Sequence, residues 1–202
     1  FGYYEFNSLN LIRKGWEGKL IDIDFEESIA LRGNLNKHYP NSKVEIINKK
    51  ITKDNINKLI LKDGIKTEID FFSLDIDSND YWILKSMDLS NINVLCCEYN
   101  HWLGNEDKLT IAYNESFKFI DNGIWGASLL ALTNLLNSKG FSLIAVESSG
   151  TNAFFINNRL ANKFEILSPK KSFKSVGRFY NEESKKKIFD NIKSNSTRLI
   201  QV

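Results

Sequence analysis

The stretch from Ile69 to Trp82 constrains the fold more than any other part of the chain. It begins as a largely apolar run, which is typical of a strand buried on both faces of a sheet. It ends in three acidic residues, Asp75, Asp77 and Asp80. Ligands of open α/β sheets bind outside the carboxyl ends of the strands, so acidic side chains at this place indicate a functional site. Apolar residues then recur at helical spacing, which predicts a strand, a turn and a helix.

The rest of the chain alternates predicted strands and helices. Helices are predicted over residues 7–14, 26–36, 53–61, 80–87, 126–138 and 181–193, and strands over 19–25, 43–48, 69–74, 93–99, 141–146 and 152–157. This alternation favours an α/β fold with a doubly wound, mainly parallel sheet. Turn-forming residues separate the last two strands, which predicts an antiparallel C-terminal hairpin. Residues 102–123 show no periodicity and are predicted to form a long functional loop.

The size and charge of the chain limit what it can do. Its 202 residues suit one domain with a tail, and we assign residues 1–165 to the domain and 166–202 to a basic C-terminal extension. The net charge of +2 gives no electrostatic reason to expect nucleic acid as a partner. There is no apolar run of the ~20 residues that a membrane-spanning helix needs. There is also no signal peptide, so the expected location is cytoplasmic. The sequence leaves open whether the protein forms a homo-oligomer.

Asp75 and Asp77 are the first candidates for catalysis. Alternation along a strand places both on one face, where their charges would repel unless something cationic lay between them. A divalent metal ion, a lysine or a protonated substrate group would serve. The alternative is helix capping, in which Asp80 and Asn79 stabilise the positive end of the following helix. Two cysteines and two distant histidines lack the spacing of a zinc site.

Three polar residues, Glu98, Asn100 and His101, end the next apolar strand. If that strand neighbours the first, these residues lie close to Asp75. His101 could then act as a general base near neutral pH. A loop histidine held by a backbone carbonyl is the alternative, and the sequence leaves both open. Tryptophans such as Trp102 are more often core residues than ligand contacts, but Trp102 flanks the long loop and is therefore a candidate ligand contact.

Asp22 and Ser128 are further candidates at the ends of predicted elements. An acid at the end of an early strand commonly accepts hydrogen bonds from ribose hydroxyls in dinucleotide-binding sheets. The alternatives for Asp22 are a surface acid and a helix N-cap. The helix that follows Gly126, Ala127 and Ser128 begins without bulky side chains, so a ligand could approach its free N–H groups. Close packing against a neighbour is the alternative there.

Several of these segments resemble one family in the same order. The segments are Asn7–Ser8 with Leu11–Ile12, residues 15–22 (Gly-Trp-Glu-Gly-Lys-Leu-Ile-Asp), residues 72–82 (Phe-Ser-Leu-Asp-Ile-Asp-Ser-Asn-Asp-Tyr-Trp), residues 97–100 (Cys-Glu-Tyr-Asn), residues 126–129 and residues 152–155. Together they resemble FkbM-like S-adenosylmethionine (SAM)-dependent methyltransferases over about residues 2–158. Each motif is short, and their order and spacing carry the resemblance.

The resemblance implies a class I methyltransferase fold, a mostly parallel, Rossmann-like sheet of seven strands with a reversed last strand. It implies that SAM is bound with its ribose on Asp22, and it assigns the cofactor site to Gly2, Asn7, Asp22, Ile51, Thr52 and Asp75. The catalytic residues would be Asp75, Asp77 and His101, with Mg²⁺ on Asp75 and Asp77. The substrate site would be Asp80, Glu98, Asn100, Trp102 and Ser128.

The chain departs from the family in two places. The first strand and the opening of the cofactor loop are missing from residues 1–202, so we expect an upstream segment. Ser78 stands where the family usually has a glycine, which alters the turn after Asp77.

The function expected from these observations is O-methylation of a small polyhydroxylated acceptor, such as a nucleotide-linked or surface-polysaccharide sugar. A metal-dependent glycosyltransferase is the first alternative, because Asp75-Ile76-Asp77 matches an Asp-x-Asp element, as does Asp22-Ile23-Asp24. A non-catalytic protein that uses the 102–123 loop and the basic tail to bind a partner is the second.

Overall fold

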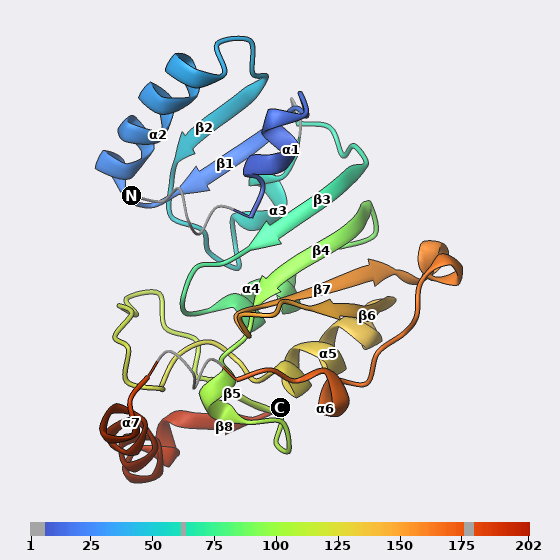
Figure 1. Cartoon of the computed structure of the whole chain (residues 1–202). Coiled ribbons are helices and arrows are strands. Elements are labelled where there is room, and N and C mark those ends of the chain that lie inside the picture. The colour runs from blue at the N-terminus through green and yellow to red at the C-terminus, as the bar shows by residue number, and fades with distance from the viewer. Residues whose placement is uncertain (1–6, 62–63, 176–179) are drawn as a thin grey trace. The chain divides into compact units, whose positions relative to one another are not determined.

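The computed structural model describes residues 7–61, 64–175 and 180–202 (Figure 1). The chain divides into two compact units, a first unit of residues Phe1–Ile65 and a second unit of residues Lys66–Val202. Gly2, which the resemblance assigns to the cofactor loop, lies outside the described residues.

The first unit is a two-stranded parallel sheet with short helices. Its elements are α1 (Leu9–Arg13), β1 (Gly18–Asp22), α2 (Phe25–His38), β2 (Val44–Asn48) and α3 (Ile56–Leu59). β1 pairs with β2 in register from Gly18 opposite Val44 to Asp22 opposite Asn48. The helix α2 begins after Asp24, whose carboxylate accepts a hydrogen bond from the N–H of Glu27 at 2.9 Å. This N-cap satisfies one of the free donors at the helix start.

The second unit is built on a four-stranded mixed sheet in the order β3-β4-β7-β6. Its strands are β3 (Ile69–Leu74), β4 (Ile92–Glu98), β6 (Phe141–Val146) and β7 (Asn152–Asn157). β3 and β4 are parallel, whereas β7 is antiparallel to both β4 and β6. The β6–β7 pair is the hairpin expected from the sequence. Because β3 is an edge strand of this sheet, it is only partly buried, with Leu74 inside and Asp70 exposed.

The prediction of a doubly wound, mainly parallel sheet of seven strands is wrong. The structure is α/β, but its described strands form three separate sheets, of two, four and two strands. In the four-stranded sheet, β3–β4 is parallel and the two pairs made by β7 are antiparallel. The difference lies in the partners of the other strands: β1 pairs with β2 and β5 with β8, so in the described residues neither pair extends the four-stranded sheet.

The core of the second unit lies between the sheet and two helices. These are α4 (Asp80–Ser86) and α5 (Leu129–Ser138), and α5 packs against both α4 and β6. The fully buried side chains include Leu74, Ile83, Leu84, Leu95, Leu129, Leu132, Phe141 and Phe155. The leucines of α5 recur at helical spacing, so one face of the helix reaches the sheet.

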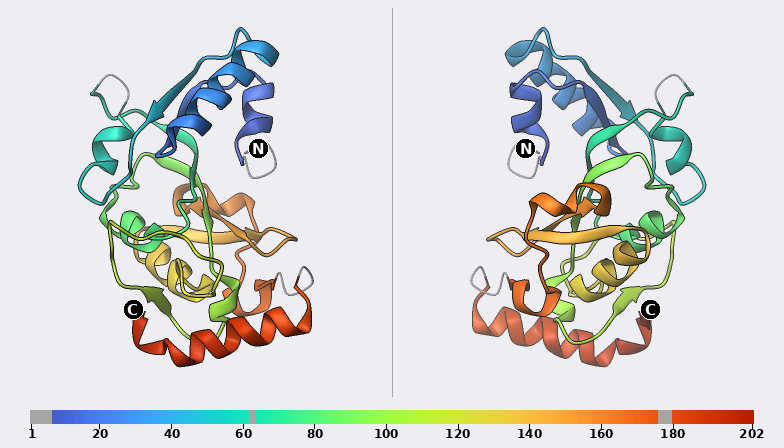
Figure 2. Two further views of the ribbon diagram at one scale, coloured as in Figure 1. Left: turned by 90° about the vertical axis from the view of Figure 1, so that its left-hand side faces the viewer. Right: turned by 90° about the vertical axis from the view of Figure 1, so that its right-hand side faces the viewer.

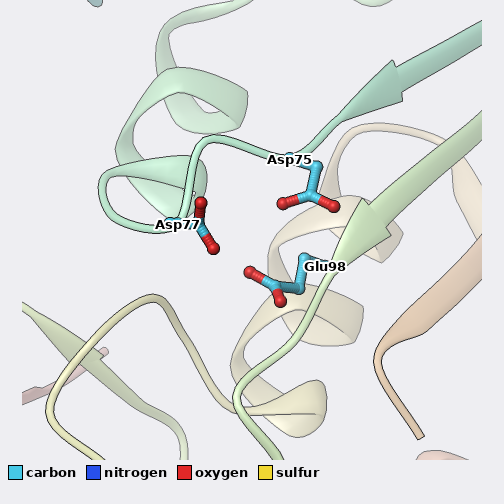
Figure 3. Close-up of side chains that lie close together, drawn as sticks. All are labelled: Asp75, Asp77 and Glu98. Carbon is cyan, nitrogen blue, oxygen red and sulfur yellow. The ribbon is translucent and has the colours of Figure 1, made fainter. Parts of the chain in front are cut away.

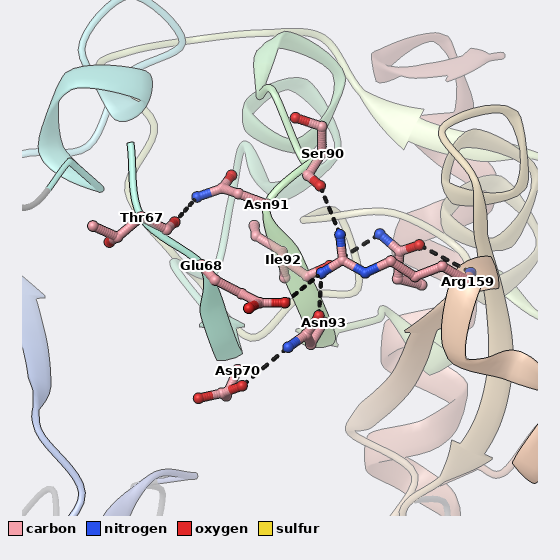
Figure 4. Close-up of polar contacts among 9 residues, drawn as sticks. Thr67, Glu68, Asp70, Ser90, Asn91, Ile92, Asn93 and Arg159 are labelled. Atoms are coloured by element: carbon pink, nitrogen blue, oxygen red, sulfur yellow. Dashed lines mark hydrogen bonds and ion pairs between the residues drawn. The ribbon is translucent and has the colours of Figure 1, made fainter. Parts of the chain in front are cut away.

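A polar network joins the amino ends of β3 and β4 to the end of β7 (Figure 4). Arg159, just after β7, donates to the carbonyl of Ser90 at 3.2 Å, to Glu68 at 2.9 Å and to Asn93. Asn93 in turn donates to Asp70 at 3.0 Å. A planar guanidinium can serve three acceptors at once, so Arg159 fixes the strands at the end of the sheet opposite the acidic residues.

The long loop and the chain after β7 contain η1 (His101–Leu103), β5 (Leu109–Ile111), η2 (Asn158–Lys163), α6 (Pro169–Ser172), α7 (Glu182–Ser194), η4 (Ser196–Arg198) and β8 (Leu199–Gln201). Of the elements after β7, α7 and β8 pack on the long loop, whereas η2 and α6 contact the four-stranded sheet and α5. β8 pairs antiparallel with β5. α7 runs alongside this part of the unit (Figure 2). Residues 166–202, expected as a basic extension, thus belong to the second unit.

The described ranges 7–61, 64–175 and 180–202 contain no helix with the length and apolar character that a bilayer crossing requires.

Candidate functional site

Three carboxylates meet at the carboxyl ends of β3 and β4. The two strands are parallel, with Leu74 opposite Cys97, so the next residues along the strands, Asp75 and Glu98, are neighbours. Asp77 follows in the turn before α4. Asp75, Asp77 and Glu98 each offer one carboxylate oxygen, and the three oxygens lie within 4.8 Å of one another. Figure 3 shows the three side chains turned toward a common point. We call this group the acidic triad.

The turn between β3 and α4 brings Asp77 to the triad. Asp77 has a φ of 55°, and among the described residues no other non-glycine has a positive φ. Aspartate tolerates this left-handed conformation better than most residues. The turn is closed from inside by Asp80, whose two carboxylate oxygens accept the N–H groups of Ile76 at 3.1 Å and Ser78 at 3.0 Å. Asp80 therefore holds the backbone that presents Asp77.

Asp80 itself does not face a ligand, because its side chain is buried with 2% of its surface exposed. Burial raises its pKa from 3.8 to about 6, against the opposing effect of the two backbone N–H groups. The nearby charge of Asp77 adds to the increase in pKa. Asp80 was predicted to bind substrate, and the structure places it in a turn-shaping role instead.

The chemistry of the triad suits a hard divalent cation. Carboxylate oxygens are the ligands that Mg²⁺, Mn²⁺ and Ca²⁺ prefer. Three acids at this separation repel each other, and a cation between them would remove that cost. Asp75 and Asp77 are exposed and Glu98 is partly exposed, so an ion and a further ligand can reach them. The donor set thus fits a metal ion, with Glu98 as a ligand that the sequence assigned to substrate.

Two of the other predicted substrate residues serve the backbone. Asn100 is fully buried; its amide donates to the carbonyls of Gly123 at 3.0 Å and Trp125 at 2.8 Å, and it accepts from the N–H of Trp102 at 2.9 Å. Ser128 caps α5, accepting from the N–H groups of Ala131 and Leu109 and donating to the carbonyl of Asp107. Both residues fix the long loop to the rest of the second unit.

His101 and Trp102 are buried in an aromatic cluster. Their ring centroids lie 4.6 Å apart, and 6% and 5% of their surfaces are exposed. Burial lowers the pKa of His101 from 6.5 to about 4. A neutral imidazole with so low a pKa is a weak base at neutral pH. His101 is therefore held inside the unit as a neutral ring, whereas Asp75 and Asp77 are exposed and open to a ligand.

The residues assigned to the cofactor fall mainly in the first unit. Asp22 ends β1, and its carboxylate accepts the N–H of Asp24 at 2.7 Å. The N–H of Thr52 is held by the side chain of Asn55 at 2.8 Å, and Ile51 beside it is partly exposed. Asn7 is partly exposed in the turn that precedes α1. These placements leave the assigned cofactor roles as predictions.

The sequence thus located the acidic triad in part. It singled out both aspartates, and it placed Glu98 near them as a substrate contact and not as a third carboxylate of one group. The signal was available, because two neighbouring strands that both end in an acid bring those acids together when the strands are parallel.

Comparison with protein-family models found no match, and comparison with curated proteins found none either. The resemblance to FkbM-like methyltransferases therefore rests on the motifs in the sequence.

Proposed function

We propose that this protein transfers a methyl group from SAM to a hydroxyl of a small polyhydroxylated acceptor, and that a divalent cation bound by the acidic triad assists the transfer. The observation that carries the proposal is the convergence of Asp75, Asp77 and Glu98 at one end of the sheet. The choice of SAM as donor is supported by the ordered motifs of the sequence. Neither argument requires the seven-stranded sheet.

The residues of the triad would do two things in this reaction. They would hold the acceptor hydroxyl in line with the activated methyl group, since such transfers depend largely on proximity and orientation. Asp75 or Asp77 would also take the proton that the hydroxyl loses. A bound divalent cation would supply Lewis acidity that lowers the pKa of the hydroxyl.

The experiment is an incubation of the protein with SAM, Mg²⁺ or Mn²⁺ and a panel of sugars and nucleotide sugars. Mass spectrometry would follow both S-adenosylhomocysteine and the methylated acceptor. We expect both products from the native protein, and a large loss in the variants Asp75→Asn and Asp77→Asn. Asp190→Asn, which changes an exposed aspartate of α7, is the matched control and should keep full activity. Absence of both products with every acceptor and both metals would refute methyl transfer.

Glycosyl transfer from a nucleotide sugar is the second candidate. The structure distinguishes the two Asp-x-Asp segments of the sequence. In the first, Asp22 and Asp24 accept backbone N–H groups at 2.7 and 2.9 Å, whereas Asp75 and Asp77 belong to the triad. The clustering of the second segment with Glu98 supports it as the holder of a metal–diphosphate group. Metal-dependent release of a nucleoside diphosphate from a nucleotide sugar, without use of SAM, would favour this candidate.

A further inference from the structure

Three aromatic side chains of the second unit are buried with unpartnered polar atoms. His101, Trp102 and Trp125 have 6%, 5% and 5% of their surfaces exposed. Among the described residues, neither ring nitrogen of His101 and neither indole N–H of the two tryptophans finds a hydrogen-bond partner. The ring of His101 lies 4.6 Å from that of Trp102 and 6.5 Å from that of Trp125, centroid to centroid. We call these three residues the aromatic cluster.

Such a concentration of unpartnered groups is unusual, because buried polar groups in proteins nearly always have partners. Another tryptophan of the same unit follows that rule. The indole N–H of Trp82 donates to the carbonyl of Ile111 at 2.8 Å. The polar atoms of the aromatic cluster therefore indicate that something outside the chain completes their hydrogen bonds.

Trp102 and Trp125 pack with Ile188, and Phe117, Tyr180 and Ile192 lie against this group. Each tryptophan also contacts one half-exposed phenyl ring at its outer side. Phe189 of α7 lies 5.5 Å from Trp102, edge to face, and 54% of its surface is exposed. Phe119 lies 5.8 Å from Trp125 in a similar arrangement, and 47% of its surface is exposed. A ligand that displaced one of these half-exposed phenyl rings would contact the indole ring on which it packs.

The chemistry of the cluster selects the kind of ligand. An indole N–H only donates, and a neutral imidazole offers one donor and one acceptor. The low pKa of His101 has burial as its cause, with no contribution from a charged side chain. A charged ligand would thus be buried without a counter-charge, which is costly. A neutral ring that carries several hydroxyl groups supplies the acceptors and the donor, and its apolar face can lie on an aromatic ring.

We propose that the aromatic cluster of His101, Trp102 and Trp125 binds a neutral, hydroxyl-rich ring such as a pyranose, which displaces the half-exposed rings of Phe119 and Phe189. Only the identification of this ring with the methyl acceptor rests on the proposed function. The binding itself requires neither SAM nor a metal ion.

The test measures binding of glucose, galactose, mannose and N-acetylglucosamine to the whole protein by saturation-transfer NMR, without SAM or divalent cations. Each sugar is used up to about 100 mM, so that even a Kd of ~10 mM would be detected. We expect at least one sugar to bind, and Trp102→Phe and Trp125→Phe to weaken that binding about tenfold or more. These variants keep one six-membered aromatic ring and remove the indole N–H together with the rest of the five-membered ring. Trp82→Phe is the matched control and should bind as the native protein does.

Thermal stability gives a second readout. Each substitution removes part of a packed indole and lowers the melting temperature by itself, so the measured quantity is the rise caused by added sugar. That rise should be smaller in Trp102→Phe and Trp125→Phe than in the native protein, and unchanged in Trp82→Phe. Binding of no sugar, or equal binding by the two cluster variants, would overturn the proposal. So would a sugar-induced rise in melting temperature that is as large in those two variants as in the native protein. Sugar binding without methyl transfer would refute the proposed function alone.

Discussion

Single residues of the second unit show how a polar side chain near a site can belong to the scaffold. Asp80 and His101 are both buried and titrate in the folded protein far from their usual pH ranges, in opposite directions. The pKa of Asp80 is raised to about 6, and that of His101 is lowered to about 4. In each case burial disfavours the charged form, which is the anion for aspartate and the cation for histidine.

These two shifts predict compensating effects of pH on stability. Between pH 6 and 4 the folded state holds a proton on Asp80 that the unfolded state has lost, so acidification stabilises the fold. Between pH 6.5 and 4 the unfolded state holds a proton on His101 that the folded state lacks, so acidification destabilises it. Each shift of two units or more corresponds to about 3 kcal/mol. The native protein should therefore change little in stability over this window as a result of these two groups.

Single substitutions should reveal each effect, measured by urea unfolding in buffer without divalent cations. Asp80→Asn should lose stability as the pH falls from 6.5 to 4, by an amount approaching about 3 kcal/mol. His101→Phe should gain stability over the same window. Parallel pH profiles for native protein and variants would contradict the account of these two residues.

At the scale of elements, the contact between α7 and the long loop is unusually close. Gly123 has a φ of +81°, and a Cβ atom added to it would lie 2.7 Å from side-chain atoms of Ile188 and Ile192. Asn191 of α7 also donates to the carbonyl of Asn122 at 2.8 Å. Glycine is thus required at position 123 both for the backbone conformation and for the approach of the helix.

Gly123→Ala should therefore cost more than the backbone strain alone. Gly140 has nearly the same φ, +83°, with no atom within 4 Å of its missing Cβ, so Gly140→Ala measures the strain by itself. We expect a loss of about 1 kcal/mol for Gly140→Ala and a further 1–3 kcal/mol for Gly123→Ala. Urea unfolding monitored by tryptophan fluorescence measures both, and equal losses would contradict close packing of α7 at Gly123.

The sequence predicted elements far better than their pairing. The strands at 141–146 and 152–157 were located to the residue, because apolar runs and turn formers are local signals. The antiparallel alignment of β7 with β4 was missed, since those strands are distant in sequence. β5 was predicted as loop, because its three residues acquire a partner only in β8 at Leu199–Gln201, at the other end of the chain. The roles of Asn100 and Ser128 were missed for the same reason, as their partners lie on the long loop.

The whole molecule is two units of unequal size. The first contributes few buried apolar residues, Ile12, Leu35 and Ile56, and a sheet of two strands. The second contains the four-stranded sheet, the helices α4 and α5 that pack with it, and the acidic triad. A small core and a two-stranded sheet rarely suffice for independent stability.

We predict that a fragment of residues 66–202 folds cooperatively by itself and that a fragment of residues 1–65 does not. Circular dichroism during thermal unfolding would test both. A sigmoidal transition for the larger fragment and a broad, non-cooperative change for the smaller one are expected. Failure of residues 66–202 to unfold cooperatively would contradict the assignment of a self-sufficient core to the second unit.

The account depends most on the acidic triad as a site for a divalent cation. The most direct measurement is calorimetric titration of the protein with Mn²⁺ and Mg²⁺, repeated with Asp77→Asn and with the control Asp190→Asn. We expect a single ion to bind, with affinity at least about tenfold lower in Asp77→Asn and unchanged in the control. Absence of binding to the native protein, or equal affinity in Asp77→Asn, would contradict the central claim.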